Sequence, residues 1–357
     1  MNTKIRELIK LAVANKASDI HLTVGEVPRI RVNSDLRMVD TFEVPQGPEQ
    51  MEEMIFSMLL EEQKRKVIEQ KEFDMSISVD DIRMRANVYY QMGKLSCALR
   101  LVSSVIPNFE QLNLPKVFGS FINLKQGFVL VTGPTGHGKS TSVASMLNEI
   151  NKARSCHMVT IEDPIEYVIK PEKALISQRE LGADTLTFDM ALRSCLRQDP
   201  NVVFVGEMRD YETISLALTV AETGHLVFST LHTNSAAQTV DRIVDVFPDG
   251  SKEQARVQLA SVISAVISQR LIPSLDGGLI PAFELMFATP AVRNAIREGK
   301  NHMLDNIIQT SSDVGMMNLE TSLAALIKQG SISEETATTY AIRPGELQSK
   351  LRSVKIK

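Results

Sequence analysis

Residues 127–147, GFVLVTGPTGHGKSTSVASML, restrict the possible folds more than any other stretch of the chain. The apolar run GFVLVT is typical of a buried strand, and the residues after the loop recur at helical spacing. Between them, Gly133, Gly138, Lys139 and Ser140 satisfy GxxxxGK(S/T). In this pattern a loop poor in side chains lets backbone N–H groups surround a phosphate. The segment therefore predicts a strand, a phosphate-binding loop and a helix, the central unit of an α/β fold.

The residue types of this loop suit the binding of ATP and Mg²⁺. Lys139 would reach the β- and γ-phosphates, and the Ser140 hydroxyl would bind Mg²⁺. A helix that begins at Ser140 adds partial positive charge. A chance match is the alternative, and the flanking strand and helix argue against it. The residues expected to contact nucleotide are Gly133, Pro134, Thr135, Gly136, His137, Gly138, Lys139, Ser140 and Thr141.

Length and composition limit what the protein binds. A chain of 357 residues suggests two domains, and a formal net charge of -4 without a basic block gives no reason to expect nucleic acid as a partner. Cys97, Cys156 and Cys195 lie far apart, which indicates neither a disulfide framework nor a zinc site and suits a reducing cytoplasm. The charged N-terminus is unlike a signal peptide, and no apolar run reaches the roughly 20 residues of a membrane span. We therefore expect no direct insertion into a membrane.

Strand and helix patterns divide the chain into two domains. Alternating runs such as FDMSISV and IRMRANVYYQ, with one expected helix at 48–70, predict a smaller α+β domain at 1–103. A proline-punctuated stretch at 104–119 is typical of a linker. In 120–357 the runs GFVLVT, HMVTIE, NVVFVG and HLVFSTL alternate with helical segments, which predicts a parallel sheet covered on both faces. From about Val240 onward we expect mainly helices.

Carboxylates follow two of the predicted parallel strands. Glu207 comes at the carboxyl end of the strand in NVVFVGEMRD, where it is placed to hold Mg²⁺ through water. The segment TIEDPIEY brings Glu162, Asp163 and Glu166 to the end of another strand, where a carboxylate can orient or deprotonate the water that attacks ATP. The pattern does not select among these three. At both places a solvated carboxylate is the alternative.

Two histidines flank the run LVFSTL. A neutral histidine at a strand end can donate a hydrogen bond to a γ-phosphate or pass on a conformational change. His232 follows the strand and is the better functional candidate, although a lone histidine is more often structural. His225 precedes the strand, and a functional and a structural role are equally plausible for it.

Several longer motifs occur in a characteristic order. They are GPTGHGKST, TIEDPIEY, ALRSCLRQDP, FVGEMRDYETISLALTVAETGHLVFSTLHTNSA and DRIVDVFP. They resemble the Walker A, Asp box, Walker B and His box motifs of the type II/IV secretion ATPase superfamily. The segments ASDIHL, QREL, VISQRL and AVRNAIREGK extend the likeness over nearly the whole chain. Within the superfamily, the sequence is most similar to the PilT-like type IV pilus retraction ATPases.

The resemblance implies a cytoplasmic, hexameric, ring-shaped motor that hydrolyses ATP to retract type IV pili and so drives twitching motility. It implies an N-terminal PAS-like domain and a C-terminal RecA-like P-loop ATPase domain. The implied partners are the cytoplasmic face of the inner-membrane pilus platform protein and related pilus ATPases. Carried over by motif, Glu166 is the general base, Glu207 the Walker B carboxylate and His232 the His-box residue.

Three arginines also match family positions. Arg83, Arg85 and Arg100 stand where the resemblance implies arginines that act on the nucleotide, and a guanidinium stabilises charge on a transferring phosphoryl group. Alternate arginines on a strand also commonly face water, which is the alternative. Which of the three would act is left open.

The sequence departs from the typical retraction motor at a few places. His137, Asn33, Gly93 and the segment AVRNAI differ from the usual residues, which makes an accessory PilU-like ATPase an alternative. An assembly or secretion ATPase is a second alternative, against which the lack of a CxxC pair and of a longer N-terminal region argues. A nucleotide-binding ring subunit with little hydrolysis is a non-enzymatic alternative, and the intact phosphate loop and carboxylates argue against it. A small-molecule P-loop kinase would need an acceptor pocket that the sequence does not indicate.

Overall fold

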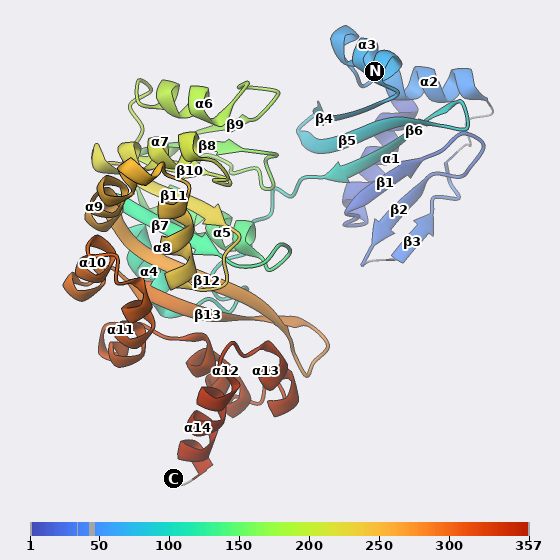
Figure 1. Cartoon of the computed structure of the whole chain (residues 1–357). Coiled ribbons are helices and arrows are strands. Elements are labelled where there is room, and N and C mark those ends of the chain that lie inside the picture. The colour runs from blue at the N-terminus through green and yellow to red at the C-terminus, as the bar shows by residue number, and fades with distance from the viewer. Residues whose placement is uncertain (1, 34, 43–46, 356–357) are drawn as a thin grey trace. The chain divides into compact units, whose positions relative to one another are not determined.

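The computed structural model describes residues 2–33, 35–42 and 47–355. The chain divides into two compact units, whose elements are labelled in Figure 1. The first comprises Met1–Val105 and Pro164–Val168, and the second comprises Ile106–Asp163 and Ile169–Lys357. A short piece of chain from the middle of the sequence thus belongs to the N-terminal unit.

The first unit is built on an antiparallel sheet. Within the described ranges its strand order is β3-β2-β1-β6-β5-β4. The strands are β1 (Asp19–Leu22), β2 (Arg29–Val32), β3 (Asp35–Met38), β4 (Glu72–Val79), β5 (Ile82–Gln91) and β6 (Lys94–Leu101). The helices are α1 (Thr3–Ala14), α2 (Pro48–Phe56) and α3 (Glu61–Gln70). This is an α+β unit, as the alternating patterns predict.

Helix α1 shows how the pattern of this unit becomes packing. Its apolar residues Ile5, Leu8 and Ile9 are buried in a cluster with residues from α2 and the sheet. The Asn2 side chain accepts a hydrogen bond from the Lys4 N–H and caps the helix. The other face of the sheet is polar, and on it Asp19 pairs with Arg100. One apolar face and one polar face are the expected result of period-two alternation.

The single helix expected at 48–70 is two helices in the structure, so this prediction was wrong. Helix α2 ends at Phe56 and α3 begins at Glu61. The Ser57 hydroxyl donates to the Met54 carbonyl and closes the first helix, and the Gln63 side chain accepts from the Leu60 N–H and opens the second. Such local bonds between side chains and backbone end a helix without interrupting its apolar periodicity.

The second unit is built on a mixed sheet whose strand order is β13-β12-β7-β11-β10-β8-β9 within the described residues. All neighbouring pairs are parallel except β12 with β13. The strands are β7 (Gly127–Thr132), β8 (His157–Glu162), β9 (Leu175–Glu180), β10 (Val202–Val205), β11 (Leu226–Leu231), β12 (Ile263–Pro273) and β13 (Leu279–Phe287). A sheet with a parallel core in an α/β unit is what the alternating apolar runs predict.

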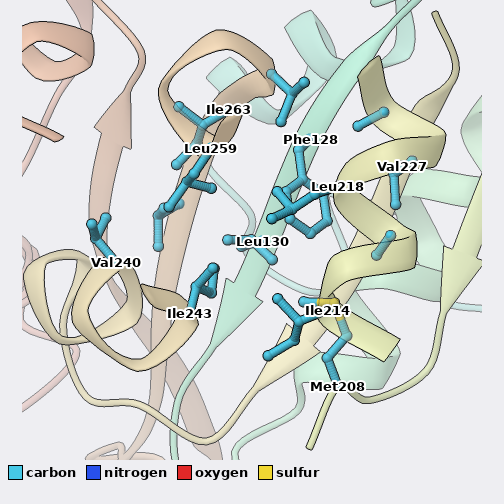
Figure 2. Close-up of a cluster of buried hydrophobic side chains, with 14 of the residues drawn as sticks. Phe128, Leu130, Met208, Ile214, Leu218, Val227, Val240, Ile243, Leu259 and Ile263 are labelled. Atoms are coloured by element: carbon cyan, nitrogen blue, oxygen red, sulfur yellow. The ribbon is translucent and has the colours of Figure 1, made fainter. Parts of the chain in front are cut away.

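Helices pack on both faces of this sheet. The helices of this unit are α4 (Gly119–Ile122), α5 (Lys139–Ala153), α6 (Phe188–Cys195), α7 (Tyr211–Glu222), α8 (Ala236–Asp245), α9 (Lys252–Val262), α10 (Pro290–Arg297), α11 (Leu304–Thr310), α12 (Leu319–Lys328), α13 (Glu334–Tyr340) and α14 (Pro344–Lys355), the last of which packs on α12. Figure 2 shows Phe128 and Leu130 of β7 within the cluster that contains Leu218 of α7 and Leu259 of α9. The intervening Val129 belongs to the cluster on the opposite face, with side chains of α5. Because β7 is buried on both faces, its sequence is continuously apolar rather than alternating.

Two strands replace helices that were expected after Val240. Strands β12 and β13 form an antiparallel pair, and β12 lies directly beside β7. Most residues of β12 are buried, including the continuous run from Ala265 to Gln269. A strand buried on both faces has no alternation, and periodicity does not distinguish it from a buried helix. The prediction of mainly helices was therefore wrong for the part of the chain next to the phosphate loop.

The stretch at 104–119, which was expected to be a linker, packs on the core of the second unit. Phe118 is fully buried and makes edge-to-face contacts with Phe109, Phe121 and Phe283. The second unit accordingly begins at Ile106. The prolines interrupt regular structure here, while the aromatic side chains supply enough apolar area to hold the segment on the unit.

Candidate functional site

The phosphate loop joins β7 to α5 at the carboxyl edge of the sheet. The strand ends at Thr132 and the helix begins at Lys139, one residue earlier than expected. Gly133 has a φ of 141°, and a Cβ there would lie 2.2 Å from the Gln269 carbonyl oxygen of the neighbouring strand. Gly138 has a φ of 77°, which favours glycine. The glycines of the motif are thus required both by conformation and by close approach to β12.

Lys139 is held inside the loop. Lys139 is only 7% exposed. Its Nζ donates hydrogen bonds to the carbonyl oxygens of Gly133 at 2.9 Å and Pro134 at 3.0 Å. The positive charge therefore lies within the turn at the amino end of α5, where a helix favours anions. A buried ammonium beside a helix N-terminus provides the positive charge that binds a phosphate group.

Three side chains from separate segments connect the loop to the ends of β10 and β11. His232 Nδ1 lies 3.3 Å from Lys139 Nζ and 3.3 Å from Thr135 Oγ1. Its Nε2 lies 2.9 Å from Glu207 Oε1. Because the lysine ammonium can only donate and the carboxylate can only accept, these partners assign the tautomer in which Nε2 carries the hydrogen. Lys139, His232 and Glu207, which the sequence proposed separately, are brought together by the fold.

Glu207 is also bound by a residue that the sequence analysis missed. Arg209, on the exposed side of the site, donates from Nη2 to Glu207 Oε2 at 2.7 Å. Burial raises the pKa of Glu207, but the Arg209 hydrogen bond and the positive charges nearby outweigh this effect and leave the pKa below its ordinary value. The carboxylate is therefore ionised at neutral pH. The only signal in the sequence was a basic residue two positions after the glutamate.

The donor set fits Mg²⁺ that arrives with a nucleotide. The described residues contain no cluster of three or more histidine, cysteine, aspartate or glutamate side chains able to hold a metal by themselves. The Ser140 hydroxyl at the start of α5 and the ionised Glu207 are hard oxygen ligands of the kind Mg²⁺ prefers. Mg²⁺ usually completes such a site with waters and substrate phosphates. The residues present are thus consistent with a metal bound together with ATP.

The carboxylates of TIEDPIEY are divided between the two units. Glu162 ends β8, is buried, and accepts hydrogen bonds from Thr160 Oγ1 and Gln178 Nε2. Asp163 is the last residue of the second unit before the chain enters the first, and it contributes to raising the pKa of Arg209, although the Glu207 hydrogen bond is the main cause. Glu166 belongs to the first unit, in the segment Pro164–Val168. The structure thus separates three carboxylates that the sequence could not distinguish.

The three candidate arginines lie on neighbouring strands of the first unit. Arg83 and Arg85 are on β5 and Arg100 is on β6, where Arg85 and Arg100 are directly opposite in the register. Arg100 Nε donates to Asp19 Oδ1 at 2.9 Å, and Arg85 Nε lies 4.0 Å from Asp74 Oδ1. Asp19 and Asp74 thus place negative charge beside Arg100 and Arg85, which offsets the repulsion expected between like charges opposite each other on a sheet.

His225 is placed away from the phosphate loop. It precedes β11, whose first residue pairs with Gly127 at the amino end of β7, whereas His232 follows the opposite end. His225 Nδ1 lies 3.0 Å from the Val220 carbonyl and 3.0 Å from Thr223 Oγ1 at the end of α7. Its contacts are therefore structural.

His137 is attached to β12 through its side chain and its backbone. Its Nδ1 accepts from the Leu271 N–H at 2.9 Å, and its carbonyl accepts from Gln269 Nε2 at 2.8 Å. Burial lowers the pKa of His137 from 6.5, and the charges of Arg270 and Lys139 lower it further. The imidazole must be neutral at Nδ1 to accept the Leu271 hydrogen bond.

This contact predicts a pH dependence. The unfolded chain takes up a proton on His137 near pH 6.5, while the folded chain resists it, so stability is present above this pH and is lost as pH falls toward the lower folded pKa. We expect wild type to be more stable than His137→Ala at pH 7.5 (about one unit above the ordinary value), and this difference to shrink in mildly acidic buffer. Thermal unfolding of both proteins across this range measures it. A difference that does not change with pH would contradict the assignment.

Comparison with known proteins gives consistent matches over almost the whole chain. Residues 1–327 match the model of a family described as type II/IV secretion system protein. The type IV pilus retraction ATPase PilT of Pseudomonas aeruginosa is 44% identical over 341 residues, covering 95% of this chain and 98% of that protein. The type IV pilus ATPase PilU of the same organism is 35% identical, covering 98% and 91%. The crystal structure of the pilus retraction motor PilT with bound ADP has a TM-score of 0.88 at 44% identity, covering 98% of this chain and all of that one (100%).

Proposed function

The chain belongs to the type II/IV secretion system protein family, and we infer from this membership that it is an ATP-hydrolysing motor that powers type IV pilus retraction. The observation that carries the ATP-hydrolysis part of this inference is the contact chain from Lys139 through His232 to Glu207 at the carboxyl edge of the sheet. It combines a buried ammonium in a phosphate loop with an ionised carboxylate, which binding and hydrolysis of a nucleoside triphosphate require. The similarity to a structure with bound ADP supports the same choice of ligand.

The residues take the following roles in this proposal. Lys139 and the loop 133–141 bind the phosphates of ATP, with Ser140 and Glu207 as the groups that hold Mg²⁺. The metal, when bound with ATP, neutralises charge on the phosphates. His232 keeps the Glu207 carboxylate oriented and places its other ring nitrogen at Lys139 and Thr135.

Four residues of the first unit are assigned roles by the family motifs. Glu166 acts as the general base that takes a proton from the attacking water. Arg83, Arg85 and Arg100 supply the positive charge that stabilises the transferring phosphoryl group, and their shared sheet face supports this role. These assignments come from the family motifs, and each is testable by replacing one side chain.

The proposed assembly is a homo-hexameric ring. In it, residues 1–103 belong to a PAS-like domain and residues 120–357 to a RecA-like ATPase domain. We propose a cytoplasmic protein that acts on the inner-membrane pilus platform protein and on related pilus ATPases. In the described residues, no helix has both the length and the apolar character needed to cross a bilayer, and a platform partner would bring the motor to the membrane.

An accessory PilU-like role is the second candidate, because the relative PilU is 35% identical over nearly the whole chain. Departures from the retraction pattern also bear on this choice. In AVRNAI, Val292 and Ala295 are buried within the core around α10. The departures from the usual residues keep the accessory role as the alternative to retraction.

Cells that lack the protein test the proposal. We expect excess surface pilin together with lost twitching, because pili would still assemble but not retract. The wild-type gene should restore both properties and the Lys139→Ala form should restore neither. Bald cells would indicate an assembly motor, and normal piliation would overturn a primary role in retraction. A purified wild-type ring that binds nucleotide without measurable hydrolysis would instead support a non-catalytic ring subunit.

A further inference from the structure

The tetrapeptide Ile-Ser-Gln-Arg occurs twice in the chain, at 176–179 and 267–270. The first copy is on β9 and the second is on β12. In the strand order, β9 lies beside β8, which leads into the TIEDPIEY segment, and β12 lies beside β7, which leads into the phosphate loop. Each copy therefore borders a strand that ends in a loop of the proposed site.

The serine of each copy contacts the neighbouring strand through its hydroxyl, Ser177 at the first residue of β8 and Ser268 at the last residue of β7. Ser177 Oγ lies 2.9 Å from His157 Nε2 of β8, and Ser268 Oγ lies 2.8 Å from Thr132 Oγ1 of β7. Since successive side chains of a strand point to opposite faces, the glutamine after each serine is directed differently from it. In both copies the glutamine therefore points away from the face of its serine, with Gln269 buried and Gln178 partly exposed.

Gln269 fastens the phosphate loop to the first turns of α5. The residue is 2% exposed; its Nε2 donates to the His137 carbonyl at 2.8 Å and its Oε1 accepts from Ser142 Oγ at 2.7 Å. His137 lies in the loop before Lys139, and Ser142 lies in the helix after it. Gln269 therefore bridges the chain on both sides of the lysine.

Gln178 makes the corresponding bridge at the other loop. Its Oε1 accepts from the Ile169 N–H at 2.8 Å, and its Nε2 donates to Glu162 Oε1 at 3.3 Å. Glu162 and Ile169 stand on either side of the segment that contains Glu166. The amide donates to one flank and accepts from the other, as Gln269 does at the phosphate loop. A carboxylate or a hydrocarbon of the same length does not make both bonds.

We propose that Gln269 and Gln178 are positioning residues for the two loops of the ATPase site. Gln269 holds the phosphate loop in its binding conformation, and Gln178 holds the flanks of the segment that carries the general base. Neither touches the reacting atoms. The proposal rests on the ATPase function inferred above and assigns one glutamine to nucleotide binding and the other to hydrolysis. Loss of Gln269 weakens nucleotide binding, and loss of Gln178 slows hydrolysis with binding retained.

The test compares Gln269→Met and Gln178→Met, since methionine keeps the length of the side chain and removes both hydrogen bonds. The dissociation constant of a fluorescent ADP analogue and the kcat for phosphate release are measured on the purified full-length protein. For Gln269→Met we expect a dissociation constant about 10-fold larger than that of wild type. For Gln178→Met we expect a kcat about 10-fold lower, with wild-type affinity for the ADP analogue. Gln254→Glu, an exposed change on α9, should behave as wild type.

Further variants keep the proposal falsifiable if a methionine variant does not fold. Gln269→Glu retains acceptance from Ser142 but places a buried negative charge against the His137 carbonyl oxygen, so we expect a loss of affinity at least as large as in Gln269→Met. Gln178→Glu retains acceptance from Ile169 and places a second carboxylate against Glu162, so we expect the loss of kcat to persist. Folded variants with wild-type affinity and kcat, or effects exchanged between the two glutamines, would overturn the inference. If wild type itself neither binds ADP nor hydrolyses ATP, the proposed function fails instead.

Discussion

Replacing Lys139 with alanine is expected to lower ATP hydrolysis by about 100- to 1000-fold. The Lys139 ammonium is buried within the loop and is the fixed positive charge of the phosphate site. An interaction of this kind strengthens as negative charge redistributes on the phosphates in the transition state, and a buried position reduces screening by water. Phosphate release by the purified protein with saturating Mg²⁺ and ATP measures the effect.

A second lysine on the same helix supplies the matched control. Lys152 lies at the other end of α5, where it pairs with Glu149 near the surface. We expect Lys152→Ala to hydrolyse ATP at the wild-type rate, because an exposed ion pair contributes little and lies far along the helix from the loop. Near-normal hydrolysis by Lys139→Ala, in a preparation that unfolds at the wild-type temperature, would overturn the assignment of this loop as the ATP site.

Replacing Glu207 with glutamine is expected to reduce hydrolysis by a similar factor, about 100-fold or more. Glutamine keeps the size of the side chain and can still accept from His232 Nε2, but it lacks the charge that Mg²⁺ and Arg209 require. The pKa of Glu207 is lowered from its ordinary 4.5, so its ionised form persists as pH falls below that value and is lost only through the lower folded pKa. Protonation of Glu207 therefore does not limit activity near neutral pH.

The Mg²⁺ dependence distinguishes metal binding from a general loss of structure. We expect Glu207→Gln to need more Mg²⁺ for half-maximal activity, while binding of a fluorescent ADP analogue without metal stays near wild type. Glu172→Gln, an exposed carboxylate of the second unit, is the control for loss of one negative charge. A Glu207→Gln protein with wild-type kcat and wild-type Mg²⁺ requirement would show that another group holds the metal.

The phosphate loop could be predicted from the sequence because its determinants are local. Gly133, Gly138 and Lys139 lie within seven consecutive residues, and the flanking strand and helix follow from the apolar pattern of the same segment. The structure places β7 and α5 at the expected positions, with a one-residue difference at the helix start. The family recognised from the longer motifs is confirmed by the family model and the relatives.

Other features depended on contacts that periodicity does not report. The chain beyond Val240 was expected to be helical, yet β12 inserts beside β7 and provides the surface on which the phosphate loop lies. The stretch at 104–119 was expected to be a linker, yet Phe118 is buried among other aromatic rings. Both errors arose where long-range burial determines the structure and local residue preferences are weak. The roles assigned to Lys139, Ser140, Glu166, Glu207, His232 and the three arginines stay predictions.

Local sequence was enough to predict the phosphate loop proposed here, whereas the placement of its partners depends on contacts between distant segments. Glycines, a lysine and a hydroxyl at fixed spacing specify a phosphate loop wherever the chain folds around them, because the backbone conformation is encoded within the loop. The contact of His232 with Lys139, separated by 93 residues, exists only because β11 pairs with β7. The same holds for Gln269, whose side chain meets the loop across 132 residues of sequence. Strand order is set by hydrogen bonding and burial between distant segments. The apolar pattern along the sequence does not specify which strands become neighbours.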